Sequence, residues 1–240
     1  MNINAAGLHF KDLNERVRET KSKGIVIDNC VGQRYIASGL RGKKLTIYGT
    51  PGNALGAYLD GSSIEVYGNT QEATGDTMND GTIVIHGCAG DATGYGMRGG
   101  KIFVEGDTGY RAGIHMKEYQ QKVPLLVIGG KAGSFLGEYQ AGGLILVLGI
   151  GRNGQLPVGR FCGTGMHGGK MILRCDELPY DLPPQVTARS AGPEELKAIA
   201  PIVREYCGYF DCQAEPILDS HFFVLEPDTK NPYKQLYTAN

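Results

Sequence analysis

The 240-residue chain contains no tryptophan, no long hydrophobic run and almost no net charge. Its 24 basic and 25 acidic side chains leave a formal net charge of −1, which lacks the basic excess that attracts nucleic acid or an anionic membrane. The longest strongly apolar run, residues 144–150, is far shorter than the roughly 20 residues that span a bilayer. The N-terminal residues do not show the basic segment followed by an apolar segment that is typical of a secretory signal peptide. We therefore expect a cytoplasmic protein that binds neither nucleic acid nor membrane.

Metal-binding cysteine motifs are also lacking. The six cysteines are Cys30, Cys88, Cys162, Cys175, Cys207 and Cys212. They include no CxxC pair, so the short ligand spacing of common zinc and iron–sulfur sites is missing. We expect no metal and no cofactor in this chain. In a cytoplasmic setting the closest pair, Cys207 and Cys212, is interpreted as reduced and structural.

Glycine is the residue in excess. It supplies 37 of the 240 residues, and 34 of these lie within residues 24–169. Collagen requires glycine at every third position, and disorder requires few β-branched residues; this stretch has neither pattern. A repeat punctuated by glycine remains.

Short apolar-x-apolar-x-Gly segments recur with a period of 19 residues. The glycines that end these segments are Gly49, Gly68, Gly87, Gly106, Gly130 and Gly149. The second half of each copy carries another set, namely Gly56, Gly75, Gly94, Gly96, Gly113, Gly137, Gly163 and Gly165. Each copy thus contains a short alternating β segment and glycine turns, with no room for a helix. This pattern predicts an all-β fold, a right-handed parallel β-helix of about seven coils, with a short N-terminal helix and a C-terminal helix and tail.

Stacking of like positions predicts which side chains are buried. One interior ladder comprises Ile25, Leu45, Ile64, Ile83, Ile102, Leu126, Ile145 and Met171. A second comprises Ile27, Ile47, Val66, Ile85, Val104, Ile128, Val147 and Leu173. A third column is interpreted as core filler and comprises Leu59, Met78, Met97, Met116, Gln140 and Met166. The alternating neighbours are expected to face solvent or a partner, as with Thr46, Glu65, Lys101 and Glu105.

The two ends break the period, which divides the chain into three parts. Residues 1–24 hold an expected capping helix with Asp12 as its N-cap, and residues 25–176 hold the repeats. Residues 177–240 comprise a Pro-rich linker, a helix and a tail that packs on the β-helix. The sequence predicts that this helix begins at Pro193, ends before Gly208 and is kinked or split at Pro201.

Two copies resemble the GXGXG domain, the β-helix at the C-terminus of the glutamate synthase large subunit. They are GDATGYGMRGGKIFVEG, residues 90–106, and GRFCGTGMHGGKMIL, residues 159–173. The same repeat type occurs in one subunit of formylmethanofuran dehydrogenase. The tail favours glutamate synthase, because it is similar to that family's closing segment at Phe222, Val224, Pro227, Tyr233 and Lys234.

The resemblance implies a noncatalytic structural and assembly subunit of a glutamate-synthase-like complex, which makes glutamate reductively from glutamine and 2-oxoglutarate. This subunit would space a glutamine amidotransferase subunit from a synthase subunit that carries FMN and an iron–sulfur cluster. Residue 2 is Asn2, so the N-terminal catalytic cysteine of an amidotransferase is absent here. The alternative is a scaffold subunit of another multisubunit redox enzyme, such as a formylmethanofuran dehydrogenase-like complex. An exposed end would allow the isolated chain to form a homo-oligomer.

Two insertions, residues 115–124 and 150–160, interrupt the period, and loops that break a repeat often carry function. We hypothesise that Tyr119, Arg152 and Arg160 contact partner subunits; uninvolved surface loops are the alternative.

Other chemistry finds less support. His86, His115 and His167 occupy different positions of the period, so no ligand cluster is expected. A more distant alternative is a carbohydrate-active enzyme with a groove lined by outward residues such as Asp60 and Asp80.

Overall fold

The computed structural model describes residues 1–228, which contain eleven strands and three helices. The helices are α1 (Phe10–Glu19), α2 (Pro193–Phe210) and α3 (Glu215–Leu218). The first six strands are β1 (Asn2–Asn4), β2 (Gly24–Val31), β3 (Lys44–Thr50), β4 (Asp60–Tyr67), β5 (Asp80–Ile85) and β6 (Lys101–Val104). The others are β7 (Leu125–Ile128), β8 (Ala141–Val147), β9 (Gly168–Arg174), β10 (Val186–Ser190) and β11 (Phe222–Pro227).

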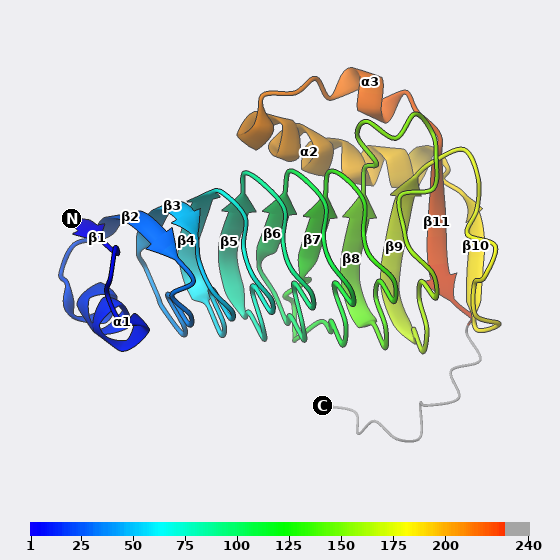
Figure 1. Cartoon of the computed structure of the whole chain (residues 1–240). Coiled ribbons are helices and arrows are strands. Elements are labelled where there is room, and N and C mark those ends of the chain that lie inside the picture. The colour runs from blue at the N-terminus through cyan, green and yellow to red at the C-terminus, as the bar shows by residue number, and fades with distance from the viewer. Residues whose placement is uncertain (229–240) are drawn as a thin grey trace.

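All of these strands belong to one open sheet, in the order β1 to β9 followed by β11 and β10 (Figure 1). Neighbours from β1 to β9 are parallel, whereas β11 is antiparallel to both β9 and β10. The prediction of an all-β right-handed parallel β-helix is therefore wrong. The described chain forms a single, mostly parallel sheet that does not close, accompanied by helices in an α/β-like arrangement.

The second half of each copy does not form a strand. Between β4 and β5, left-handed residues alternate with others at Ala73 (φ 57°), Gly75 (φ 72°) and Thr77 (φ 51°). A strand requires φ near −120°, so these segments are turns, whatever their side-chain pattern. Their amides donate alternately to the next and the previous copy: Ala73 N to Asp91 O, and Gly75 N to Leu55 O, both at 2.8 Å.

The turn segments pack against one face of the sheet, which we call the inner face, and enclose the main core. Every member of the two predicted ladders is buried there, in the predicted register from strand to strand, so both ladders are confirmed. The third column is buried as well, Gln140 included. Its amide nitrogen donates to Gly142 O and Gly143 O, each at 3.1 Å, which satisfies a donor that would otherwise be costly to bury.

Two glycines show why the repeat requires this residue. Gly75 has a positive φ, and a Cβ there would collide with the Ile102 side chain of the inner face. Gly68, with φ 148°, lies against the backbone carbonyl of Gly49 in the preceding copy, so a Cβ would strike main-chain atoms. Neighbouring copies can therefore stack closely at these two positions because glycine has no Cβ.

The opposite, outer face of the sheet is divided into two regions. Over the later strands, α2 covers a second core that contains Phe103 and Val127 from the sheet and Ile199 and Val203 from the helix (Figure 1). Val26, Thr46 and Glu65 of β2 to β4 stand in register with Phe103 and Val127 on this face, but they remain partly exposed. Among the side chains expected to face solvent or a partner, Glu105 is exposed and Thr46 and Glu65 are partly exposed. Lys101 instead pairs with Glu205 of α2, with Nζ 2.7 Å from Oε2.

The N-terminal part differs from its prediction in two respects. Helix α1 begins at Phe10 with His9 as N-cap, whose Nδ1 accepts from Lys11 N at 3.4 Å, so the assignment of Asp12 as N-cap is wrong. Asp12 instead lies in the first turn, where a carboxylate favours the positive end of the helix dipole. In addition, β1 precedes α1 and pairs with β2, which extends the sheet at this end.

The C-terminal part contains the predicted helix. α2 begins at Pro193 and continues through Pro201 to Phe210, so Pro201 does not split it and Gly208 does not end it. Phe222, Val224 and Pro227 lie in β11, whereas Tyr233 and Lys234 lie outside the described residues. Within residues 1–228, no helix has the length and apolar character needed to cross a membrane.

Candidate functional site

The first insertion lies at the edge of the sheet where the parallel strands begin, directly before β7. Tyr119 is 48% exposed on this loop, and its backbone pairs with that of Lys122. The Lys122 ammonium holds the loop against earlier copies, with Nζ 3.0 Å from Asp80 Oδ2 and 3.7 Å from Asp60 Oδ1. The hydrogen bond from Lys122 lowers the pKa of Asp80 below its usual value. Tyr119 is therefore presented by an anchored loop.

The second insertion lies at the opposite edge, because it follows the end of β8. Arg152 Nη2 is 3.3 Å from Asp107 Oδ2, an ion pair between two copies. The carbonyl of Gly154 accepts the Asp176 amide at 2.8 Å, which ties this loop to the segment after β9. Arg152 is thus already engaged within the chain.

Arg160, the last residue of the second insertion, lies in the turn segments that cover the inner face. Its amide donates to Ser134 Oγ at 3.1 Å, its carbonyl accepts from Phe135 N at 2.9 Å, and its side chain is exposed. The structure does not bring Tyr119, Arg152 and Arg160 together, because two lie at opposite sheet edges and one in the turn layer. Their contact with partners stays a prediction, and any such contacts involve separate surfaces.

The three histidines also lie apart. His86 stacks on Tyr67 on the outer face, with ring centroids 4.4 Å apart, whereas His115 stacks on Tyr139 at 5.2 Å. His167 Nδ1 is 3.0 Å from Gly165 O. In the part of the chain that the structure describes, no group of three or more His, Cys, Asp or Glu side chains could hold a metal ion.

Aromatic columns are a feature that the sequence analysis missed. Tyr48, Tyr67 and His86 stand 19 residues apart and stack on the outer face, with the two tyrosine ring centroids 5.1 Å apart. Phe210 at the end of α2 packs edge-on against His86 at 5.2 Å. Glu65 Oε1 accepts from the Tyr67 hydroxyl at 3.0 Å. The 19-residue spacing of these three rings is the sequence signal that predicts their stacking.

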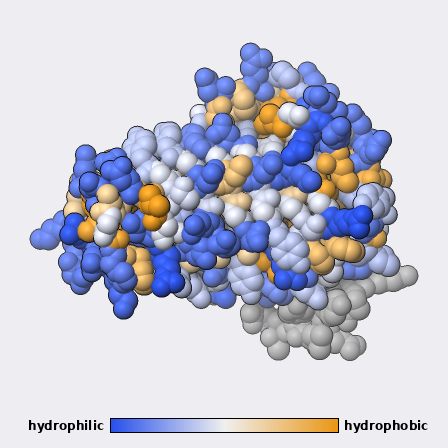
Figure 2. All heavy atoms as spheres, viewed as in Figure 1, coloured by the Kyte–Doolittle hydropathy of each residue, from blue (hydrophilic) through white to orange (hydrophobic). Residues whose placement is uncertain are grey.

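A second aromatic column lies in the turn layer. Phe135 contacts Tyr110 on one side and Phe161 on the other, with centroids 5.2 and 4.9 Å apart. The Arg111 guanidinium lies over the Tyr110 ring at 4.7 Å and pairs with Glu138 at 2.6 Å. Figure 2 shows one face of the molecule coloured by hydropathy. Hydrophobic residues on this face form small patches among hydrophilic ones.

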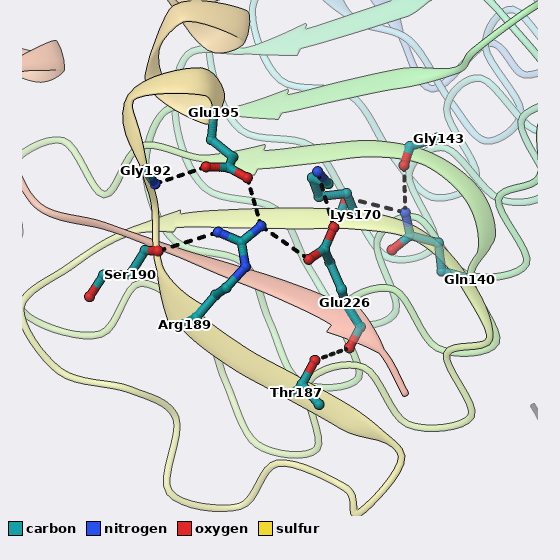
Figure 3. Close-up of polar contacts among 9 residues, drawn as sticks. All are labelled: Gln140, Gly143, Lys170, Thr187, Arg189, Ser190, Gly192, Glu195 and Glu226. Carbon is teal, nitrogen blue, oxygen red and sulfur yellow. Dashed lines mark hydrogen bonds and ion pairs between the residues drawn. The ribbon is translucent and has the colours of Figure 1, made fainter. Parts of the chain in front are cut away.

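Polar contacts fasten α2 to the antiparallel end of the sheet (Figure 3). Arg189 of β10 pairs with Glu195 of α2 at 2.6 Å and with Glu226 of β11 at 3.3 Å, and Lys170 of β9 pairs with Glu226 at 3.0 Å. Glu195 also accepts the Gly192 amide at 2.8 Å. The hydrogen bonds from Arg189 and Gly192 lower the pKa of Glu195 to about 2. We call the four charged residues Lys170, Arg189, Glu195 and Glu226 the clasp.

Comparison with known proteins gives the family of this chain and a shared fold. The model of the GXGXG motif family matches residues 10–226, and the chain belongs to this family, that of the C-terminal domain of the glutamate synthase large subunit. A relative from Methanocaldococcus jannaschii, the uncharacterized protein MJ1350, is 45% identical over 251 residues, which cover 99% of this chain and 96% of the relative.

A solved structure shares the fold at lower sequence similarity. It is a chain in the crystal structure of the formyltransferase/hydrolase complex (FhcABCD) from Methylorubrum extorquens in complex with methylofuran. The two chains superpose with a TM-score of 0.62 and 20% identity, over 84% of this chain and 72% of that chain.

Proposed function

We propose that this chain is a noncatalytic structural and assembly subunit of a glutamate-synthase-like complex that makes glutamate reductively from glutamine and 2-oxoglutarate. The observation that carries the proposal is the family match over residues 10–226, which includes the repeats and all of the closing strand β11 except its last residue. The proposed location of this complex is the cytoplasm.

The geometry supports a spacing role. The two insertions project from opposite edges of one continuous sheet, so they could face two different partners at once. The sheet between them is stiffened by a core of stacked aliphatic side chains, because native cores are close-packed and resist deformation. We assign the two partners as a glutamine amidotransferase subunit and a synthase subunit that holds FMN and an iron–sulfur cluster.

A second candidate is a scaffold subunit of a formylmethanofuran dehydrogenase-like complex. The observation that favours it is the fold shared with one chain of the formyltransferase/hydrolase complex. At 20% identity this likeness concerns the fold, so we rank it second.

Affinity capture of the tagged full-length chain from its native cells tests the first proposal. We expect a flavoprotein and an amidotransferase to co-purify, with a flavin absorption spectrum, and glutamine-dependent amination of 2-oxoglutarate to fall when this subunit is removed. Capture of the subunits of a formylmethanofuran dehydrogenase-like complex instead would support the second candidate. Capture of neither set, with activity unaffected by removal, would contradict both.

Point variants then test the partner-contact residues. Tyr119→Ala and Arg152→Ala should each weaken co-purification of one partner, since the two loops lie at opposite edges. Tyr180→Ala is the matched control, because Tyr180 is 78% exposed outside both insertions. Unchanged co-purification in both loop variants would remove these residues from the interface.

A further inference from the structure

Two thiols meet at the C-terminal end of α2. The Sγ atoms of Cys207 and Cys212 are 2.7 Å apart, and the Cys212 amide donates to the Cys207 carbonyl at 3.3 Å. Between them Asp211 adopts a left-handed conformation (φ 49°), which turns the chain back on the helix. A disulfide bond is about 2.0 Å long, so a further approach of only about 0.7 Å would join the sulfurs.

The two sulfurs differ in access. Cys207 is buried in the second core beside Tyr206, whereas Cys212 is half-buried and reaches the surface. Burial raises the pKa of the Cys207 thiol above its usual value. An external reagent therefore meets Cys212 first, with Cys207 behind it as a protonated thiol.

We propose that Cys207 and Cys212 form a redox-active dithiol that a low-molecular-weight disulfide oxidises to an intramolecular disulfide. The Cys212 thiolate attacks one sulfur of the external disulfide, breaks its S–S bond and releases one thiolate. Cys207 then loses its proton and attacks Cys212 Sγ, which breaks the mixed disulfide and releases the second thiolate. The two cysteines lose two electrons and two protons, and the external disulfide leaves as two thiols.

The other four cysteines have different surroundings. Cys30 contacts Gln33, Cys162 contacts Met171 and Cys175 contacts the Glu177 carbonyl, all through buried sulfurs. Cys88 is exposed. Oxidation by the external disulfide is thus expected at the pair, with Cys88 as a competing site for simple mixed-disulfide formation.

The disulfide would close a short loop where the chain leaves α2 for α3. This is also where Phe210 contacts His86, at the boundary between the covered and open regions of the outer face. The redox state of the pair would therefore control how firmly the end of α2 is held. This inference is independent of the proposed function.

The test uses the full-length Cys88→Ser protein incubated with oxidised glutathione. Remaining thiols are counted by alkylation under denaturing conditions with mass spectrometry, and peptides are mapped without reduction. We expect the loss of two thiols, one cross-linked peptide that joins residues 207 and 212, no retained glutathione, and full recovery with dithiothreitol.

Single variants in the same background separate the two roles. Cys207→Ser should leave a stable glutathione adduct on Cys212, because the resolving thiol is gone. Cys212→Ser should leave Cys207 unmodified and open to alkylation after unfolding. Circular dichroism confirms that each variant is folded. Five free thiols in the oxidised Cys88→Ser protein, with Cys207 and Cys212 both still reduced, or a persistent adduct on Cys212 without the cross-link, would overturn the proposal.

Discussion

The two regions of the outer sheet face differ, although the inner face behind them is uniform. One outward column runs in register through Thr46 and Glu65 to Val84, Phe103 and Val127. Thr46 and Glu65 are polar and partly exposed, and the later members are buried beneath α2. The repeat therefore determines the inner face, whereas a segment outside the repeat decides which part of the outer face is covered.

The largest expected effect contrasts the two regions directly. Phe103→Ala should lower the free energy of unfolding by about 3–5 kcal/mol, because it removes a ring buried under α2. Thr46→Ala, in the same column, should change it by no more than about 0.5 kcal/mol. Urea unfolding followed by circular dichroism measures both. Equal losses would contradict the division of the outer face.

A glycine pair tests the close approach between copies. Gly68→Ala should cost about 2–4 kcal/mol, because it combines backbone strain with a collision against the Gly49 carbonyl. Gly61→Ala is the matched control: Gly61 has φ 84° but open space around a new Cβ, so we expect only about 1–2 kcal/mol of strain. The same urea series compares them, and a Gly61 variant as unstable as the Gly68 variant would refute the collision.

A smaller loss of stability is expected at Gln140, the polar member of the third buried column. Gln140→Met should cost about 1–3 kcal/mol, because Gly142 O and Gly143 O lose their buried donor. Met97→Leu, a volume-conserving change in the same column, should cost less than about 1.5 kcal/mol. Thermal melts rank the two. A Gln140→Met protein as stable as the wild type would show that its amide is dispensable.

The smallest effect concerns the clasp and depends on pH. The pKa of Glu195 is lowered from 4.5 to about 2, so its contribution to stability is fully present above pH 4.5 and is lost as the pH falls toward 2. Glu195→Gln should therefore melt slightly below the wild type at pH 7, and the difference should disappear near pH 2. A difference that stays constant across this range would argue against the ion pair with Arg189.

The sequence could predict the inner face because one physical signal, the 19-residue spacing of apolar side chains, controls it. The same spacing could not show that the second half of each copy consists of turns. Residues such as Ala73 and Thr77 adopt a left-handed backbone conformation, which the pattern of apolar side chains does not indicate. The sequence does contain a signal for the burial of the outer face under α2. In one outward column the residues change from polar Glu65 to apolar Val84 and Phe103. The N-cap at His9 and the pairing of β11 depend on contacts that the spacing does not encode.

For the candidate site, the sequence located the exposed loops but not their separation. The broken period indicates both insertions alike, yet strand direction places Tyr119 and Arg152 at opposite edges of the sheet. The aromatic column at Tyr48 and Tyr67 was available from the spacing alone. The meeting of Cys207 and Cys212 required the turn at Asp211, which a sequence pattern does not specify.

The most direct test of the divided outer face is hydroxyl-radical footprinting of the intact, isolated chain, read residue by residue by mass spectrometry. Tyr48 and Tyr67 are 46% and 41% exposed, whereas Phe103 and Tyr206 are 0% and 1% exposed. We predict rapid modification of the first two rings and strong protection of the other two. Modification of Phe103 and Tyr206 as fast as that of Tyr48 would show that α2 does not cover the sheet, and would contradict the account.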